Sequence, residues 1–215
     1  RRAQIVQCTR LKVLQLGRNG LKGELPAALA LCVGLERLEL HENLLEGPVP
    51  EALTTALPRL AVLRLQGNQL KGDLPTAWAC SRLQTFDASR NLLQGSVSKQ
   101  LVGLQRLEVL SLAHNRLDAH LPDGEGVWRC TRLRVLRLDH NRFQGELPRR
   151  LFETCVELEE VCVSNNTFSG DLPGTLRCCA RLRELDVHTN FFRGAVPCDQ
   201  LRECRQLRLL NLMHQ

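Results

Sequence analysis

The sequence predicts an α/β solenoid, a stack of coils with short parallel strands on one face and short helices or 3-10 turns on the other. Two observations predict this fold. A motif of three leucines and one asparagine recurs along the 215 residues every 23 to 26 residues. Most copies continue into a glycine, a proline and a short apolar segment. Regular repeats of this length stack on their neighbours and bury one continuous core.

The full motif reads L-x-x-L-x-L-x-x-N-x-L-x-G-x-L-P. Eight copies match it, and they begin at Leu11, Leu35, Leu60, Leu83, Leu107, Leu133, Leu158 and Leu182. A ninth, partial copy begins at Leu207. We therefore expect one domain over residues 1–215, with about nine coils of 23 to 26 residues. Capping segments are missing from both ends of the pattern, so we expect a fragment of a longer protein.

The L-x-L segment of each copy alternates, and this pattern predicts a short strand with its leucines facing the core. Parallel copies about 4.8 Å apart would close the hydrogen-bond ladder. The asparagine follows the strand, where the coil must turn, and its amide can donate and accept at once. We expect a structural ladder of these amides, satisfying backbone groups of their own and adjacent coils: Asn19, Asn43, Asn68, Asn91, Asn115, Asn141, Asn166 and Asn190.

The second half of each copy predicts a turn followed by a short helix. Glycine recurs at Gly23, Gly47, Gly72, Gly95, Gly145, Gly170 and Gly194. Ala119 replaces this glycine in the fifth copy, and Ser98 replaces the proline in the fourth. The apolar segment after the proline suits one or two turns of helix or 3-10 helix. The longer segment "PDGEGVWRC" predicts a local loop in the fifth copy.

The G-x-[LIV]-P element after the asparagine resembles the plant-type leucine-rich repeat. That family includes plant receptor kinases, receptor-like proteins and polygalacturonase inhibitors, with members in algae and other protists. The resemblance covers essentially the whole chain. It implies a horseshoe or right-handed superhelix with a parallel sheet on the concave face and short helices or 3-10 turns on the convex face. It also implies an extracellular or membrane-tethered location.

Most of the ten cysteines share one register, three residues before the first leucine of a copy. They are Cys8, Cys32, Cys80, Cys130, Cys155, Cys179 and Cys204. Leucine fills the same position in two copies, at Leu57 and Leu104. A position that accepts leucine or cysteine predicts a buried column of thiols, although the coil spacing is also compatible with disulfides.

Three cysteines, Cys162, Cys178 and Cys198, lie outside this register. Cys198 and Cys204 flank one short segment and are placed to pair in an oxidising compartment. If the thiols are reduced, a cytoplasmic location is expected instead. The zinc-type spacing of two CxxC motifs is missing from the sequence, so we expect no metal held by cysteines.

The exposed strand positions, between the buried leucines, form the candidate binding face. Its charged and imidazole side chains are Arg64, Asp87, Arg90, His114, Arg137, Asp139, His140, Glu160, Asp186 and His188. The apolar positions Val62, Val109 and Val135 lie among them. A face of mixed charge favours a protein or peptide ligand, because charge complementarity confers specificity.

The formal net charge is +6, and much of the excess lies before the first leucine of each copy. This lateral arginine column comprises Arg10, Arg59, Arg82, Arg106, Arg132 and Arg181. A polyanion is one candidate partner for it, but aromatic stacking residues are lacking, and we expect no nucleic acid. No apolar run reaches 18 residues, so we expect no membrane insertion by this segment.

His114 and His140 occupy the same position of successive copies, beside Asp139. These residue types suit a metal or acid–base site. The sequences "LAHN" and "LDHN" are also similar to the "LSHN" variant common in the family, which needs no such function. We therefore expect no metal, no cofactor and no catalytic residues. One glycosylation sequon, Asn165-Asn166-Thr167, would place a glycan on Asn165 in a secreted chain.

These observations favour a non-catalytic module that recognises a protein or peptide, resembling a receptor ectodomain and binding through the concave face. The alternative is an intracellular leucine-rich repeat scaffold or adaptor. A secreted enzyme inhibitor and a metal-dependent hydrolase at the His114/His140 pair are less favoured. The sequence sets neither the ligand nor the oligomeric state.

Overall fold

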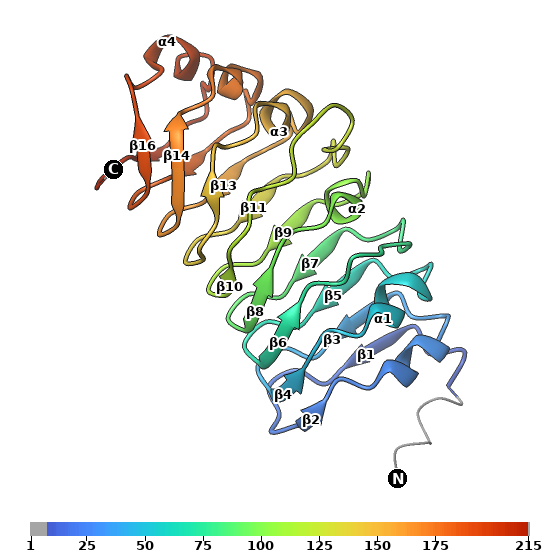
Figure 1. Cartoon of the computed structure of the whole chain (residues 1–215). Helices are drawn as coiled ribbons and strands as arrows, with labels where there is room; N and C mark the ends of the chain where they lie inside the picture. Colours follow the sequence, from blue (N-terminus) through green and yellow to red (C-terminus); the bar gives the residue numbers. More distant parts are fainter. Residues whose placement is uncertain (1–7, 215) are drawn as a thin grey trace.

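The computed structural model describes residues 8–214, which form coils stacked in sequence order from the N-terminus to the C-terminus (Figure 1). One strand from each coil joins a parallel nine-stranded sheet. Its members are β1 (Val13–Gln15), β3 (Arg37–Glu39), β5 (Val62–Arg64), β7 (Thr85–Asp87), β9 (Val109–Ser111), β11 (Val135–Arg137), β13 (Glu160–Cys162), β15 (Glu184–Asp186) and β17 (Leu209–Asn211). The predicted fold class is confirmed.

The register of this sheet aligns equivalent repeat positions side by side. Arg137 of β11 pairs with Ser111 of β9 on one side and with Cys162 of β13 on the other. The leucines between the exposed positions point inward, and Leu110 and Leu136 are 1% and 0% exposed. Side chains at one repeat position therefore form a column that runs along the sheet face.

A second set of short parallel strands follows the asparagines, and the sequence pattern did not predict it. Five strands form one sheet: β2 (Lys22–Glu24), β4 (Leu44–Gly47), β6 (Gln69–Asp73), β8 (Leu92–Gly95) and β10 (Arg116–Leu117). Three more form another: β12 (Gln144–Gly145), β14 (Thr167–Asp171) and β16 (Phe191–Arg193). The two sheets are separated in the fifth coil, where Ala119 replaces the glycine and a single bridge, His120 to Gln144, crosses the gap.

Short helices occupy the far side of most coils, as the apolar segments predict. They are η2 (Ala27–Leu31), α1 (Glu51–Thr55), α2 (Lys99–Val102), α3 (Arg149–Thr154), η3 (Gly174–Cys178) and α4 (Cys198–Leu201). Most follow a proline, whereas Ser98 caps α2 by accepting a 3.1 Å hydrogen bond from the Leu101 amide. This bond explains how the fourth coil tolerates the loss of its proline.

Tryptophans replace the helix in two coils. Trp78 and Trp128 are 6% and 2% exposed, and each indole Nε1 donates a 2.7 Å hydrogen bond to a proline carbonyl of its own coil, Pro75 and Pro122 respectively. The segment around Trp128 is the loop expected in the fifth coil. A large side chain with a satisfied N–H fills the space that the helix occupies elsewhere.

The asparagine side chains join neighbouring coils. Asn68 Nδ2 donates to the carbonyl oxygens of Leu65 in its own coil and Leu40 in the preceding coil, at 2.9 and 3.0 Å. Its Oδ1 accepts from the Leu45 amide of the preceding coil at 3.0 Å. Asn19 is the exception, because it is exposed and, among the described residues, its side chain bonds only to the Leu16 and Gly17 carbonyls of its own coil.

The cysteine register is buried at six of its seven positions. Cys8 is exposed, contrary to expectation, because no further coil among residues 8–214 packs on that side of it. The Cys130 and Cys155 Sγ atoms lie 3.6 Å apart. Cys198 and Cys204, which flank one short segment, are both free thiols, so the disulfide between them that the sequence allows is not formed in this structure.

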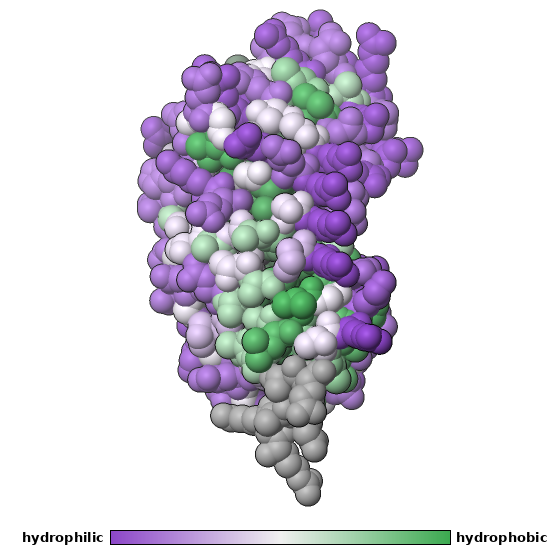
Figure 2. Space-filling view, turned by 90° about the vertical axis from the view of Figure 1, so that its right-hand side faces the viewer, coloured by the Kyte–Doolittle hydropathy of each residue, from purple (hydrophilic) through white to green (hydrophobic). Residues whose placement is uncertain are grey.

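The surface differs along the stack. In the view of Figure 2, apolar side chains gather beside the N-terminal end, whereas polar side chains cover most of the remainder. Among the apolar residues of the first coils, Leu31 and Val33 are 57% and 51% exposed. Within residues 8–214, no helix combines the length and apolar character needed to cross a membrane.

Candidate functional site

The main depression on the sheet face has a volume of about 340 Å³ and spans the fourth to the eighth coil. Eight of the ten predicted binding-face residues line it: Arg90, His114, Arg137, Asp139, His140, Glu160, Asp186 and His188. Arg64 and Asp87 lie outside it. Ser89, Ser111, Ser164 and Glu184 complete much of its polar wall.

The residues directly before the corner asparagines form one column, and their backbone conformation places their side chains at the rim of this depression. The residue before each corner asparagine has a positive φ, between 52° and 59° at Arg18, Glu42, Arg90, His114, His140, Asn165 and Thr189. His214, at the equivalent position of the ninth copy, has a φ of 53° and precedes Gln215. Gly67 occupies the same position with φ of 68°. This left-handed turn was not predicted. Gly67 and Asn165 were the sequence signals for it, since glycine and asparagine adopt this conformation more readily than most residues.

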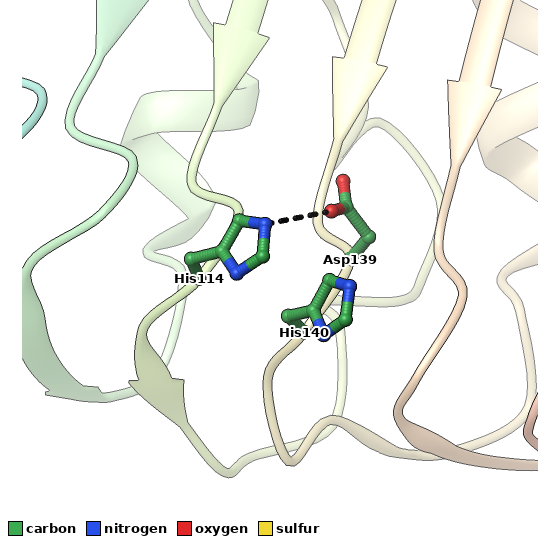
Figure 3. Close-up of side chains that lie close together, drawn as sticks. All are labelled: His114, Asp139 and His140. Atoms are coloured by element: carbon green, nitrogen blue, oxygen red, sulfur yellow. Dashed lines mark ion pairs between the residues drawn. The ribbon is translucent and has the colours of Figure 1, made fainter.

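His114 and His140 stack face to face in this column, with ring centroids 4.1 Å apart and an interplanar angle of 11°. The Asp139 carboxylate lies beside them, with its Oδ2 3.8 Å from His114 Nε2 (Figure 3). Burial and the neighbouring His140 and Arg90 together lower the pKa of His114, although Asp139 acts in the opposite direction. A neutral imidazole therefore predominates at this position near pH 7.

At the acidic end of the depression, one carboxylate charge is balanced by an arginine of the same sheet face. Arg137 pairs with both oxygens of Glu160, and its Nη2 lies 2.9 Å from Glu160 Oε2. The Cys162 thiol sits between Glu160 and Glu184, at 3.5 and 3.6 Å from their Oε1 atoms. Burial, followed by the two carboxylates, raises the pKa of Cys162 strongly. This thiol is therefore a poor nucleophile at neutral pH.

His188 is the centre of a polar network at the C-terminal side of the depression. Its Nδ1 lies 2.5 Å from Asp186 Oδ1 and 3.0 Å from Asn211 Nδ2. Its Nε2 lies 3.0 Å from Nδ2 of Asn165, the sequon asparagine. These contacts hold the side chains of three successive coils in place and leave the network without a free nucleophile–base pair.

The apolar positions among these residues contribute little exposed surface. Val62 is only 9% exposed, and Val109 and Val135 are half-buried. The expectation that Val62 offers an apolar contact on this face is therefore wrong. Its side chain is covered by its neighbours in the stack. The lateral arginine column is exposed along its length, and Arg181 in it pairs with Glu157.

The chain resembles known proteins both in sequence and in structure. A sequence model of the Leucine Rich Repeat family matches residues 132–153. The ectodomain of the plant membrane receptor kinase GASSHO1/SCHENGEN3 from Arabidopsis thaliana, solved with CASPARIAN STRIP INTEGRITY FACTOR 2, superposes on 98% of the chain with a TM-score of 0.91 and 30% identity. This chain belongs to the plant-type leucine-rich repeat family.

Two further structures resemble the leucine-rich repeat chain. The ectodomain of the Arabidopsis receptor kinase HAESA, solved with an extended IDA peptide hormone, matches 97% of it with a TM-score of 0.87 and 32% identity. The BIR3–SERK2 complex from Arabidopsis thaliana matches 62% of it with a TM-score of 0.55 and 37% identity, covering 69% of the matched chain. Curated proteins gave no sequence match.

The chain is shorter than the receptor ectodomains that it resembles. It spans 25% of the GASSHO1/SCHENGEN3 chain and 35% of the HAESA chain. The resemblance is therefore to a run of coils within those proteins.

Proposed function

We propose that the sheet-face depression binds a peptide or an extended segment of a protein, without catalysing a reaction. The observation that carries the proposal is the continuous polar wall that five successive coils contribute. Similar ectodomains were solved with peptide hormones or a named ligand factor, which supports the same use of this chain.

The dimensions of the depression favour an extended ligand. Five coils are separated by four strand spacings of about 4.8 Å, which together give about 19 Å. An extended chain advances about 3.3 Å per residue, so about six residues fit along the wall. The proposed ligand is therefore a short extended segment lying across the strands, with side chains directed into the columns.

The charges of the wall favour a ligand that places a basic side chain at the end of the depression formed by the C-terminal coils. Asp139, Glu184 and Asp186 lie there, and none of them forms a salt bridge with an arginine among residues 8–214. Arg90 stands at the opposite side of the depression, also without a salt bridge within the described residues. The ligand that complements this pattern is acidic at one end and basic at the other.

A random peptide library displayed on phage tests the proposal. A metal chelator is present throughout, so that any binding is independent of metal ions. Peptides enriched on the unmodified chain should lose at least about tenfold in affinity on an Arg90→Asn, Glu184→Gln double variant, which removes a charge at each end. Asparagine is chosen at position 90 because it tolerates a positive φ.

The control is Arg132→Gln in the exposed lateral arginine column, which lies off the depression and should leave binding unchanged. Failure to enrich any peptide would contradict the proposal. So would peptides that respond to the Arg132 variant and not to the double variant.

A further inference from the structure

We propose that His114, Asp139 and His140 form a binding site for a divalent transition-metal ion, for which Zn²⁺ is the representative. Each residue offers one ligand atom, and the three atoms lie within 4.8 Å of one another. Metal binding at this site requires no peptide, so this inference is independent of the proposed function and is tested separately.

The donor set selects the class of ion. Two imidazole nitrogens and one carboxylate oxygen are ligands that Zn²⁺, Cu²⁺, Ni²⁺ and Fe²⁺ accept, whereas Mg²⁺ and Ca²⁺ prefer oxygen alone. Three protein ligands leave coordination positions open to water, as in metal sites that are accessible from solvent. The rim position of both histidines in the depression provides that access.

The solenoid places the two histidines side by side. They occupy the same column of adjacent coils, on the left-handed turn with φ of 54° at both residues. The preceding coil has Arg90 in this column and the following coil has Asn165. Within the described residues, only the fifth and sixth coils therefore bring two imidazoles together, with a carboxylate from Asp139 beside them (Figure 3).

The carboxylate is available to an ion. Within residues 8–214, the only basic side chain in close contact with the Asp139 carboxylate is His114, at 3.8 Å, and this imidazole is neutral near pH 7. A second cluster, Glu160, Cys162 and Glu184, has comparable spacing. Arg137 already binds both oxygens of Glu160, which leaves that cluster occupied by a protein cation.

Binding requires the imidazole rings to turn. The stacked rings are nearly parallel, at 11°, whereas a shared ion must lie in the plane of each ring, along its nitrogen lone pair. Both histidines are exposed, and 45% of the His114 side chain is accessible, so rotation about the side-chain bonds is not blocked by packing. The stacked arrangement is therefore the metal-free one, and ion binding would separate the rings.

Sequence reasoning favoured an ordinary family variant at these positions, because histidine before the corner asparagine needs no function. The repeat pattern places the three residues at neighbouring positions. The structure adds the distances between their donor atoms and, within residues 8–214, the lack of an arginine paired with Asp139. Both features belong to side-chain placement across coils.

Isothermal titration of the whole reduced chain with Zn²⁺ tests the inference, and Co²⁺ absorption reports the ligand type. We expect one ion per chain at this site and a Co²⁺ spectrum of nitrogen and oxygen ligands. His114→Asn, His140→Asn and Asp139→Asn should each weaken binding by at least about tenfold. Asparagine is tolerated at positive φ, which preserves the turn in the two histidine variants.

His214→Asn is the matched control, because His214 lies in the same column with φ of 53° and has Thr189, not histidine, in the coil before it. It should leave the affinity unchanged. Arg90→Asn should strengthen binding several-fold, since it removes a cation next to His114.

Equal affinity of the unmodified chain and the His114→Asn, His140→Asn double variant would overturn the inference. A Co²⁺ spectrum with thiolate bands that persists in Asp139→Asn would also overturn it, because the ion would then be held by cysteines.

Discussion

At the scale of single residues, the corner asparagines show how one amide serves two coils. Asn91 Nδ2 donates to Leu65 and Ala88 carbonyls at 3.1 and 3.0 Å, and its Oδ1 accepts from the Leu70 amide at 3.0 Å. Two of these groups belong to the preceding coil. Buried polar groups are tolerated only when they are satisfied, so the position admits almost no other side chain.

Replacing Asn91 by alanine should lower the free energy of unfolding by about 3 kcal/mol, because a buried amide and carbonyl groups lose their partner. Asn19→Ala is the matched control, since the Asn19 side chain is exposed and forms no hydrogen bond to another coil within residues 8–214. We expect it to cost about 0.5 kcal/mol or less. Urea denaturation measures both, and equal losses would show that the ladder contributes nothing beyond its own coil.

The reactivity of each cysteine thiol should depend on how deeply it is buried. Under reducing, native conditions, Cys8 and Cys198 should react first with an aromatic disulfide reagent, because both are exposed. Burial raises the pKa of Cys80 to about 11 and that of Cys179 to about 12, so these thiols hold little thiolate and are also inaccessible. The seven buried thiols should react only on unfolding.

Mass spectrometry of the labelled peptides identifies the sites. Rapid native labelling of Cys80 or Cys179 would show that the core opens far more readily than its packing implies.

At the scale of strands and coils, charged pairs join neighbours along the edge of the sheet. Glu159 lies between Arg134 of the preceding coil and Arg183 of the following coil, at 2.6 and 2.8 Å. The hydrogen bond from Arg134 is the main reason that the pKa of Glu159 is lowered. Because this link spans three coils, its removal should destabilise the packing between all three.

A lowered carboxyl pKa means that the folded state binds its proton more weakly than the unfolded state. The stabilisation by Glu159 is therefore fully present above its ordinary pKa of 4.5 and is lost as the pH falls through the lowered value. Glu159→Gln should cost about 0.5 to 1 kcal/mol at pH 7, since both arginines are half exposed.

At about pH 3 the difference between the variant and the unmodified chain should shrink, and 1 M salt should shrink it at pH 7. Chemical denaturation at each pH and salt concentration measures this. A difference that is the same at both pH values would show that Glu159 acts by packing and not by charge.

At the scale of the whole molecule, the chain is a one-dimensional stack. Its core is a set of columns, and one of them contains the stacked rings of Phe143, Phe168 and Phe192, with centroids 6.0 and 6.2 Å apart. Each coil touches only its neighbours, so stability is approximately a sum of coil and interface contributions.

Phe168→Ala should cost about 3 to 5 kcal/mol locally, because Phe168 is fully buried and its removal leaves a cavity between two coils. In hydrogen exchange, amides of the sixth to eighth coils should lose protection, while those of the second to fourth coils keep theirs. Loss of protection by the same factor throughout the chain would show that it unfolds as a single unit.

The solenoid, the strand columns and the corner positions all follow from the amino-acid sequence. Each depends on the spacing of leucine, asparagine and glycine along the chain, and this spacing fixes which residues face inward and which share a column. It also indicated which residues share the sheet face, and eight of the ten candidates named there line one depression.

The contacts between side chains of neighbouring columns depend on packing in three dimensions. The left-handed turn before each asparagine, the gap in the second sheet at Ala119, the exposure of Cys8 and the pairing of Arg137 with Glu160 all depend on the adjacent coil. So do the distances between the donor atoms of His114, Asp139 and His140. A repeat pattern states which position a side chain occupies, but its partners are set by distances and rotamers across coils, and these come from packing in three dimensions.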